Sequence, residues 1–182
     1  VRTLATIAGI IHKTGDTKQA DKLFQEGLDI AHSMKDNGWI SKDIAIELVK
    51  AGKFDQALAV ASSIKESGSM LWALIALGDI AAELAVAGKT NQADNIMKQA
   101  LEQFDSIKDV NNKIATSVPL VRALARSNNL NKALEIAHTQ ESADIKTWLL
   151  WNIGDALIDV NNTKQAAEVL EEALRTAKSI EN

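Results

Sequence analysis

Histidine, aspartate and glutamate are the side chains of this sequence that could bind a metal ion or transfer protons. The three histidines, His12, His32 and His138, lie far apart, and no two are spaced to share one helical face as zinc ligands would. There is no cysteine, so thiolate ligands and a cysteine nucleophile are both lacking. The motifs HExxH, GxSxG, GxxxxGKS/T and DDxxD do not occur. We therefore expect a protein that is not an enzyme and has no catalytic residue, no metal site and no cofactor.

Tryptophan offers a different chemistry, because it is enriched among the residues that dominate protein–protein binding. The sequence has four tryptophans, Trp39, Trp72, Trp148 and Trp151. Trp151 follows Trp148 by about one helical turn. Whether these rings face solvent or the interior depends on the elements that carry them.

An internal repeat predicts those elements. Five Gly or Asn residues are each followed five positions later by alanine. The pairs are Gly15 with Ala20, Gly52 with Ala57, Gly88 with Ala93, Asn128 with Ala133, and Asn161 with Ala166. Aliphatic residues recur four and eight positions before each turn and eight positions after it, which is the spacing of one helical face. Because Gly and Asn suit the left-handed conformation that ends many helices, each unit is predicted to be two helices joined by a tight turn.

The predicted fold is all-α, with about five helix-turn-helix hairpins and no strands. The hairpins are expected at about residues 1–34, 38–66, 69–108, 111–140 and 142–181, within a single repeat domain over residues 1–182. Thr17, Thr90 and Thr163 are the expected N-caps of the second helices of hairpins one, three and five. Those three helices align with one another, whereas hairpins two and four have shorter second helices. The repeating unit is therefore predicted to be a pair of unequal hairpins.

The spacing of the hairpins and the position of their small residues resemble the tetratricopeptide repeat (TPR). Successive turns are 37, 36, 40 and 33 residues apart, and Ala8, Ala45, Ala81 and Gly154 lie seven positions before a turn. The family's early Trp, its Tyr in the first helix and its closing Pro are missing, so the repeats are degenerate. The resemblance implies a right-handed α-α superhelix, or solenoid. Such a solenoid would act as a protein–protein interaction scaffold that binds a peptide or protein segment on its concave face.

The resemblance also implies that the first helix of each hairpin lines the concave face. Trp39 and Trp148 both lie thirteen positions before a turn, and other non-core positions of the first helices complete a predicted partner-binding groove. The groove residues are Trp39, Lys42, Asp43, Asp79, Arg122, Trp148, Trp151, Asn152 and Asp155. In the alternative interpretation, the tryptophans fill the contact between neighbouring hairpins.

A helical repeat of this kind is also compatible with two other functions. The first is a self-associating assembly scaffold, and with it a homo-oligomer. The second is RNA recognition, because the segment KAGKFDQAL resembles the pentatricopeptide repeat, in which polar side chains read bases. The matching inward positions carry Ala5, Gly78, Val118 and Trp151, and the net charge of −4 repels phosphate. We therefore expect a protein or peptide partner and no nucleic acid.

Composition sets the remaining expectations. The sequence is 46% hydrophobic and 24% charged, but no apolar run approaches the roughly 18 residues of a membrane-spanning helix. We expect no membrane association and a cytoplasmic location. The chain begins at Val1 inside an apolar-periodic segment, so we expect it to be part of a longer chain.

Overall fold

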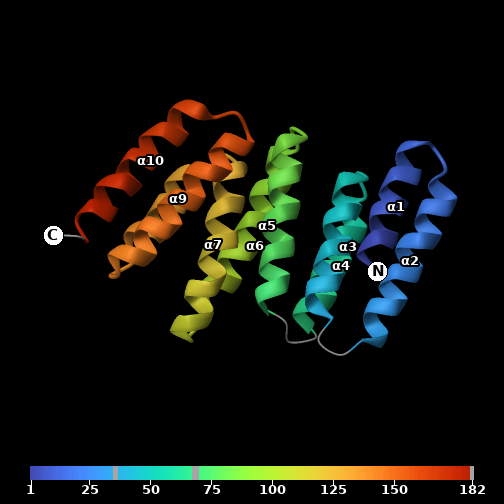
Figure 1. Cartoon of the computed structure of the whole chain (residues 1–182). Helices are drawn as coiled ribbons and strands as arrows, with labels where there is room; N and C mark the ends of the chain where they lie inside the picture. The colour runs from blue at the N-terminus through green and yellow to red at the C-terminus, as the bar shows by residue number, and fades with distance from the viewer. Residues whose placement is uncertain (35–36, 67–69, 181–182) are drawn as a thin grey trace.

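The computed structural model describes residues 1–34, 37–66 and 70–180, which form ten helices and no strands. Successive helices pair as hairpins that stand side by side from the N-terminus to the C-terminus (Figure 1). The helices are α1 (Arg2–Lys13), α2 (Thr17–Ser33), α3 (Gly38–Lys50), α4 (Phe54–Glu66), α5 (Met70–Val86), α6 (Thr90–Asp105), α7 (Val110–Arg126), α8 (Leu130–His138), α9 (Ala143–Asp159) and α10 (Thr163–Lys178). The predicted all-helical repeat fold is confirmed. The predicted hairpin bounds at residues 69 and 181 lie outside the described residues.

Each hairpin turns at a residue with positive φ, as predicted. These residues are Gly15, Gly52, Gly88, Asn128 and Asn161, with φ between 59° and 97°. At Gly52, two backbone hydrogen bonds close the turn. The Gly52 N–H donates to the Val49 carbonyl (2.8 Å), and the Lys53 N–H donates to the Leu48 carbonyl (2.9 Å). Both bonds satisfy carbonyls at the end of α3 that would otherwise lack a partner within the helix.

The second helices begin one residue away from the predicted position. The expected N-caps Thr17, Thr90 and Thr163 are instead the first helical residues, so this prediction is wrong. The N-caps are the residues directly after the turns, namely Asp16, Lys89 and Asn162. The turn is so tight that the residue after it already serves as the cap. Of these three caps, only Asp16 has a side chain that accepts a hydrogen bond from the helix backbone, from the Gln19 N–H at 3.0 Å.

The odd-numbered helices form one layer and the even-numbered helices form another. In the odd layer each helix contacts the next, from α1 to α9. Within the residues that the structure describes, no even-numbered helix packs its backbone against another even-numbered helix. A stack with one closely spaced layer and one spread layer bends toward the closely spaced layer. We therefore call the side of the odd helices the inner face and the side of the even helices the outer face.

The core lies between the two layers and is built on small residues. The five alanines of the repeat, Ala20, Ala57, Ala93, Ala133 and Ala166, are all buried. Gly78 in α5 shows how closely the odd helices approach one another. A Cβ atom at this glycine would lie 2.8 Å from the Cβ of Ala123 in α7. Small residues therefore set the close spacing of the inner layer.

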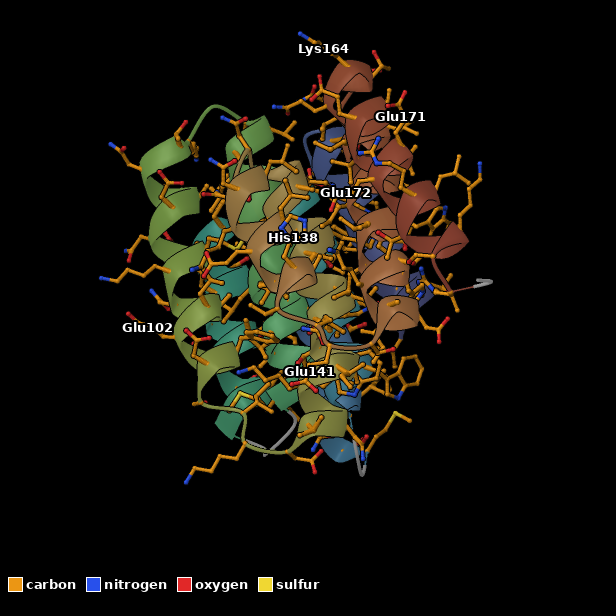
Figure 2. The ribbon with its side chains drawn as sticks, turned by 90° about the vertical axis from the view of Figure 1, so that its left-hand side faces the viewer. Glu102, His138, Glu141, Lys164, Glu171 and Glu172 are labelled. Carbon is orange, nitrogen blue, oxygen red and sulfur yellow. The ribbon has the colours of Figure 1, made fainter. Side chains whose placement is uncertain are left out.

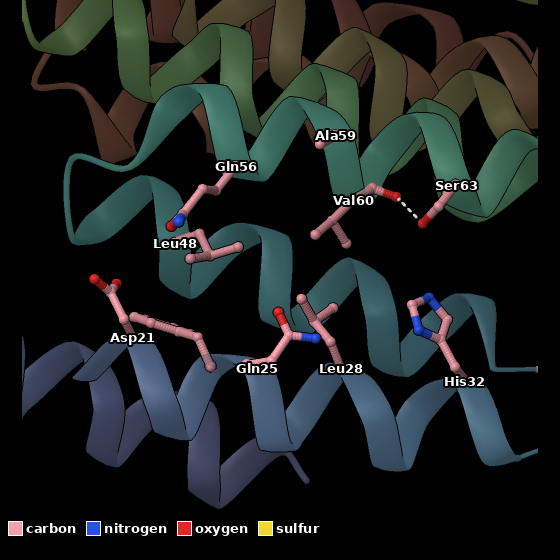
Figure 3. Close-up of a pocket in the computed structure, with 10 residues that line it drawn as sticks. Asp21, Gln25, Leu28, His32, Leu48, Gln56, Ala59, Val60 and Ser63 are labelled. Atoms are coloured by element: carbon pink, nitrogen blue, oxygen red, sulfur yellow. Dashed lines mark hydrogen bonds between the residues drawn. The ribbon is translucent and has the colours of Figure 1, made fainter. Parts of the chain in front are cut away.

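Clefts open on the outer face where the even helices diverge. The cleft between α2 and α4 has a volume of about 340 Å³ and is lined by Leu28, Leu48 and Val60 (Figure 3). A cleft of about 270 Å³ between α6 and α8 has Leu101 and Ile136 at the repeat positions of Leu28 and Val60. Both clefts separate a long second helix from a short one. From α2 to α10 the second helices have 17, 13, 16, 9 and 16 residues, which confirms the predicted alternation of unequal hairpins.

Candidate functional site

The inner face carries two exposed indole rings. Trp39 in α3 and Trp148 in α9 lie at the same repeat position and are 48% and 47% exposed. Arg2 and Ala115, at this position in other hairpins, are exposed as well. Ile75, at this position in α5, is partly buried, so the position faces solvent in four of the five hairpins.

Asp79 in α5 pairs with an arginine of the next first helix. The Arg126 guanidinium in α7 lies 3.6 Å from Asp79 and 2.7 Å from Glu83. Burial raises the pKa of the Asp79 carboxyl above its ordinary value, and the charges of Arg126 and Lys42 offset part of this rise. The carboxylate of Asp79 is therefore held inside a charge network between two helices.

Arg122 pairs with the following first helix, α9, whereas Arg126 pairs with the preceding one, α5. It lies one turn before Arg126 in α7, and its guanidinium contacts Asp155 (2.5 Å) and Asp159 (3.2 Å) in α9. The two arginines thus join the first helices of three consecutive hairpins, α5, α7 and α9. The predicted groove residues Asp79, Arg122 and Asp155 belong to this network.

Lys42 and Asp43 form a similar contact nearer the N-terminus. The Lys42 ammonium lies 2.6 Å from the Asp43 carboxylate and 5.8 Å from the centre of the Trp72 ring in α5. Arg2 in α1 approaches Asp43 to 3.5 Å. Asp43 is buried, so its carboxylate is occupied by contacts within the stack.

Asn152 is also buried. Its side-chain amide donates to the Trp148 carbonyl at 2.8 Å, inside the same helix. The structure therefore places Asn152 beneath the surface, where it stabilises the turn of α9 that carries Trp148.

Trp151 lies one helical turn after Trp148 in α9, about 60° around the helix from it. Its repeat position, ten residues before the turn, faces the following hairpin elsewhere in the stack. At this position, Lys42 in α3 lies over the ring of Trp72 in α5, and Gly78 in α5 packs against Ala123 in α7. Trp151 is 52% exposed, and α9 belongs to the last hairpin of the described residues. The place of Trp151 in the partner-binding groove therefore stays a prediction.

Trp148 and Trp151 nevertheless share one slot at the end of the stack. The slot has a volume of about 450 Å³ and is also lined by Asp144, Ala177 and Ile180. Ala177 and Ile180 come from the end of the chain and reach the start of α9 because α9 and α10 are antiparallel. Their part in this slot was not predicted, since no local sequence pattern signals it.

Arg126, Glu83 and Asp159 were also missed by sequence reasoning. The sequence does contain a signal for these contacts. Each arginine contacts two carboxylates that are four residues apart in the sequence, and this spacing places the two carboxylates on one face of their helix. The register between neighbouring helices, which decides the pairing, is not visible in the sequence.

Polar side chains also join two outer helices near the C-terminal end. His138 Nε2 at the end of α8 lies 2.8 Å from Glu172 Oε1 in α10, and Figure 2 shows the two residues close together in a view of this end. The Lys146 ammonium lies 3.9 Å from the same carboxylate. In the described part of the chain, no group of three or more His, Asp or Glu side chains is arranged to hold a metal ion. Nor do the described helices include one with the length and apolar character needed to span a membrane.

One hairpin matches a known repeat family. The tetratricopeptide repeat family matches residues 149–179, which lie within the last hairpin. The positive-φ turn residue and the buried alanine of this hairpin recur in the four hairpins before it. Residues 149–179 are therefore similar to a tetratricopeptide repeat, and the four preceding hairpins share its turn and its buried alanine. TPR repeats typically form scaffolds for protein–protein interaction rather than enzymes.

Two solved structures of TPR-like repeats are similar to this chain. One is the crystal structure of the Podosopora anserina putative kinesin light chain with nearly identical TPR-like repeats. It is 14% identical, with a TM-score of 0.44, and covers 98% of this chain and 95% of its own. The other is a variant of the same protein, 15% identical with a TM-score of 0.44, covering 100% of this chain and 96% of its own. No curated protein matches the sequence.

Proposed function

We propose that this TPR-like chain is a protein–protein interaction scaffold whose inner face binds an extended segment of a partner protein. The observation that carries the proposal is the exposure of two indoles, Trp39 and Trp148, at the same repeat position of different hairpins. Tryptophan combines a large apolar ring with an N–H donor and is strongly enriched at binding hot spots. The two rings are the anchors of the proposed site.

The distance between the anchors sets the length of the bound segment. Three helix-to-helix contacts, α3 to α5, α5 to α7 and α7 to α9, separate Trp39 from Trp148. Packed helices are about 8–10 Å apart, so the anchors are separated by about 25–30 Å. An extended chain covers about 3.3 Å per residue, so the bound segment has at least about eight residues.

The charges between the anchors favour a segment without a long run of like charge. Arg122 and Arg126 already pair with carboxylates of neighbouring helices. A strongly charged ligand would compete with these contacts, whereas apolar side chains can pack on the indoles without breaking them. The partner segment is therefore expected to place apolar or aromatic side chains at both anchors.

Random twelve-residue peptides displayed on phage supply the probe for this proposal. Peptides selected on the wild-type chain would be titrated by calorimetry into wild type, Trp39→Ala and Trp148→Ala. Each substitution is expected to weaken binding by about 30-fold, the equivalent of the roughly 2 kcal/mol expected of a hot-spot residue. Val110→Ala removes another exposed apolar side chain outside the anchors and is expected to bind as wild type does.

Thermal unfolding separates an effect on binding from an effect on folding. Because both indoles are about half exposed, each alanine variant should melt within a few degrees of wild type. The proposal fails if the selected peptides bind the Trp39→Ala/Trp148→Ala double variant as tightly as wild type. It fails as well if no peptide can be selected.

A further inference from the structure

The outer cleft between α2 and α4 lies between two successive hairpins, so both of its walls belong to the described chain. Its floor is apolar, because Phe24 of α2, Leu48 of α3 and Val60 of α4 are buried beneath it and Leu28 of α2 is half-buried beside them. In the described residues, the backbones of α2 and α4 do not pack against each other. An apolar floor is therefore left open on the outer face.

Each wall of this cleft is one face of a helix. The rim side chains of a wall are spaced by three, four or seven residues, and Figure 3 shows those of α2 directed toward α4 across the open space. The rim residues are Asp21, Gln25 and His32 in α2 and Gln56, Ala59 and Ser63 in α4. From Gln56 to Ser63 the rim of α4 covers two turns, which is about 10 Å. The cleft is therefore a groove that runs along both helices, and we call it the α2–α4 groove.

The volume of the α2–α4 groove fits side chains rather than a whole helix. It measures about 340 Å³, and an apolar cavity of about 150 Å³ accepts one benzene ring, so there is room for about two large apolar side chains. A helix with its side chains is about 10–12 Å in diameter and does not fit inside. A helix lying along the groove can insert two side chains of one face, one or two turns apart. The groove thus matches the i, i+4 or i, i+7 spacing of the apolar side chains of an amphipathic helix.

The charges of the outer helices favour a basic partner. The second helices together carry twelve Asp and Glu residues against eight Lys and Arg, whereas the first helices carry seven against eight. At the rim of the groove, Lys53 pairs with Asp21 at 2.7 Å. Asp29 accepts a hydrogen bond from Gln25 at 2.8 Å, and no basic side chain of the described residues pairs with it. A Lys or Arg beside the apolar stripe of a partner helix can pair with this carboxylate.

The equivalent cleft between α6 and α8 carries charged side chains where the α2–α4 groove does not. Lys132 and Glu135 occupy the repeat positions of Gln56 and Ala59, and their side chains form an ion pair at 2.8 Å. A carboxylate at this rim opposes the entry of an apolar side chain, because covering the charge costs free energy. The exposed methyl group of Ala59 is thus the feature that leaves the α2–α4 groove accessible.

We propose that the α2–α4 groove is a second docking site, which takes two apolar side chains of an amphipathic helix from a partner protein, with a basic residue of that helix beside Asp29. The site lies on the outer face and uses neither Trp39 nor Trp148. The inner and outer faces can therefore hold different segments at the same time.

Helical peptides displayed on phage supply the probe. A framework of about eighteen Ala, Gln and Lys residues, long enough to form a helix, carries randomised apolar residues at i, i+3, i+4 and i+7. Selection uses the Trp39→Ala/Trp148→Ala variant, which lacks the anchors of the inner face. The failure of this site and the failure of the inner-face site are therefore separate results.

The selected peptides would be titrated by calorimetry into wild type, Ala59→Glu and Ser62→Glu. Ala59→Glu introduces the residue that the α6–α8 cleft has at this position, and it is expected to weaken binding at least tenfold. Ser62→Glu adds the same charge at an exposed position of α4 that does not line the groove, and it is expected to bind as wild type does. Both residues are exposed, so each variant should melt within a few degrees of wild type.

Asp29→Asn tests the basic contact. The asparagine keeps an oxygen that can accept from Gln25 but loses the charge. Binding is expected to weaken about threefold, as for an exposed ion pair, and to depend less on salt. An unchanged affinity and salt dependence would overturn the placement of a basic residue beside Asp29.

The proposal is overturned if no helical peptide can be selected, or if the selected peptides bind Ala59→Glu as tightly as wild type. It is overturned as well if Ser62→Glu weakens binding as much as Ala59→Glu does. An apolar dye that binds in the groove when no helical peptide does would assign the groove to small molecules. Self-association of the wild type that Ala59→Glu abolishes would assign it to a second copy, and either result overturns the proposal.

Discussion

At the scale of single residues, two helical glycines differ in what an added methyl group would meet. At Gly78 a Cβ would lie 2.8 Å from the Cβ of Ala123, which cannot rotate away, whereas at Gly27 the nearest atom is Ile44 Cδ1 at 3.7 Å. Alanine in place of a helical glycine gains about 1 kcal/mol, and overpacking costs about 1–3 kcal/mol. In urea denaturation, Gly27→Ala should therefore raise the free energy of unfolding and Gly78→Ala should lower it. Changes of equal sign would contradict the close approach of α5 and α7.

The raised pKa of Asp79 gives a residue-scale prediction for pH. Burial favours the protonated carboxyl in the folded state, so the stability that Asp79 contributes is fully present below its unfolded value of 3.8 and is lost as pH rises through the raised folded pKa. Asp79→Asn removes this titration. The stability of the variant relative to wild type should therefore increase as pH rises from about 4 toward neutrality. Urea denaturation at several pH values measures this, and a relative loss over the same range would show that the ion pair with Arg126 outweighs burial.

Repeat position predicted which residues lie on the first helices, but it did not predict their exposure. Asp43, Asp79 and Asn152 share one position, nine residues before the turn, yet Asp43 and Asn152 are buried and Asp79 is partly exposed. The Asp43 carboxylate is covered by the neighbouring side chain of Lys42. The Asn152 side-chain amide donates a hydrogen bond to the Trp148 carbonyl in its own helix. These differences depend on contacts between particular side chains, which the repeat pattern does not specify.

At the scale of the helix, the start of α2 depends on a single side chain. The Asp16 carboxylate accepts a hydrogen bond from the Gln19 N–H at 3.0 Å, and its charge lies at the positive end of the helix dipole. Asp16→Ala should lower the free energy of unfolding by about 1 kcal/mol. Thr17→Ala is the matched control, since Thr17 is the first helical residue and not the cap. If the control lost as much stability as Asp16→Ala, the cap would have been assigned to the wrong residue.

Helices and turns could be predicted from the sequence because their signals are local. A tight left-handed turn requires Gly or Asn, and helical spacing of apolar residues appears on both sides of each turn. The N-caps of the second helices were predicted one residue too late, because the residue directly after each turn already serves as the cap of the next helix. The slot of Trp148 with Ile180 could not be predicted, since it joins the start of α9 to the end of the chain.

At the scale of the whole molecule, stability is expected to vary along the stack. Within the described residues, the backbone of the central helix α5 packs against α3, α4, α6 and α7, whereas that of α1 packs only against α2 and α3, and that of α10 only against α9. In a solenoid each hairpin is stabilised by its neighbours, so an end hairpin opens at lower free energy than a central one. The open stack in Figure 1 contains no contact between its two ends that would offset this difference within the described residues.

Amide hydrogen exchange at low micromolar concentration, followed by mass spectrometry, measures this gradient. Peptides from α5 and α7 should exchange most slowly, and peptides from α1, α2 and α10 most rapidly, because local opening of an end hairpin breaks only one joint. Ala93→Leu, which overpacks the buried crossing of α5 with α6, should speed exchange in the centre and flatten the gradient. Lys98→Leu changes an exposed residue of the same helix and should leave the gradient as it is. Uniform protection from α1 to α10 in the wild type would mean that all five hairpins open in one cooperative step, contrary to an additive stack.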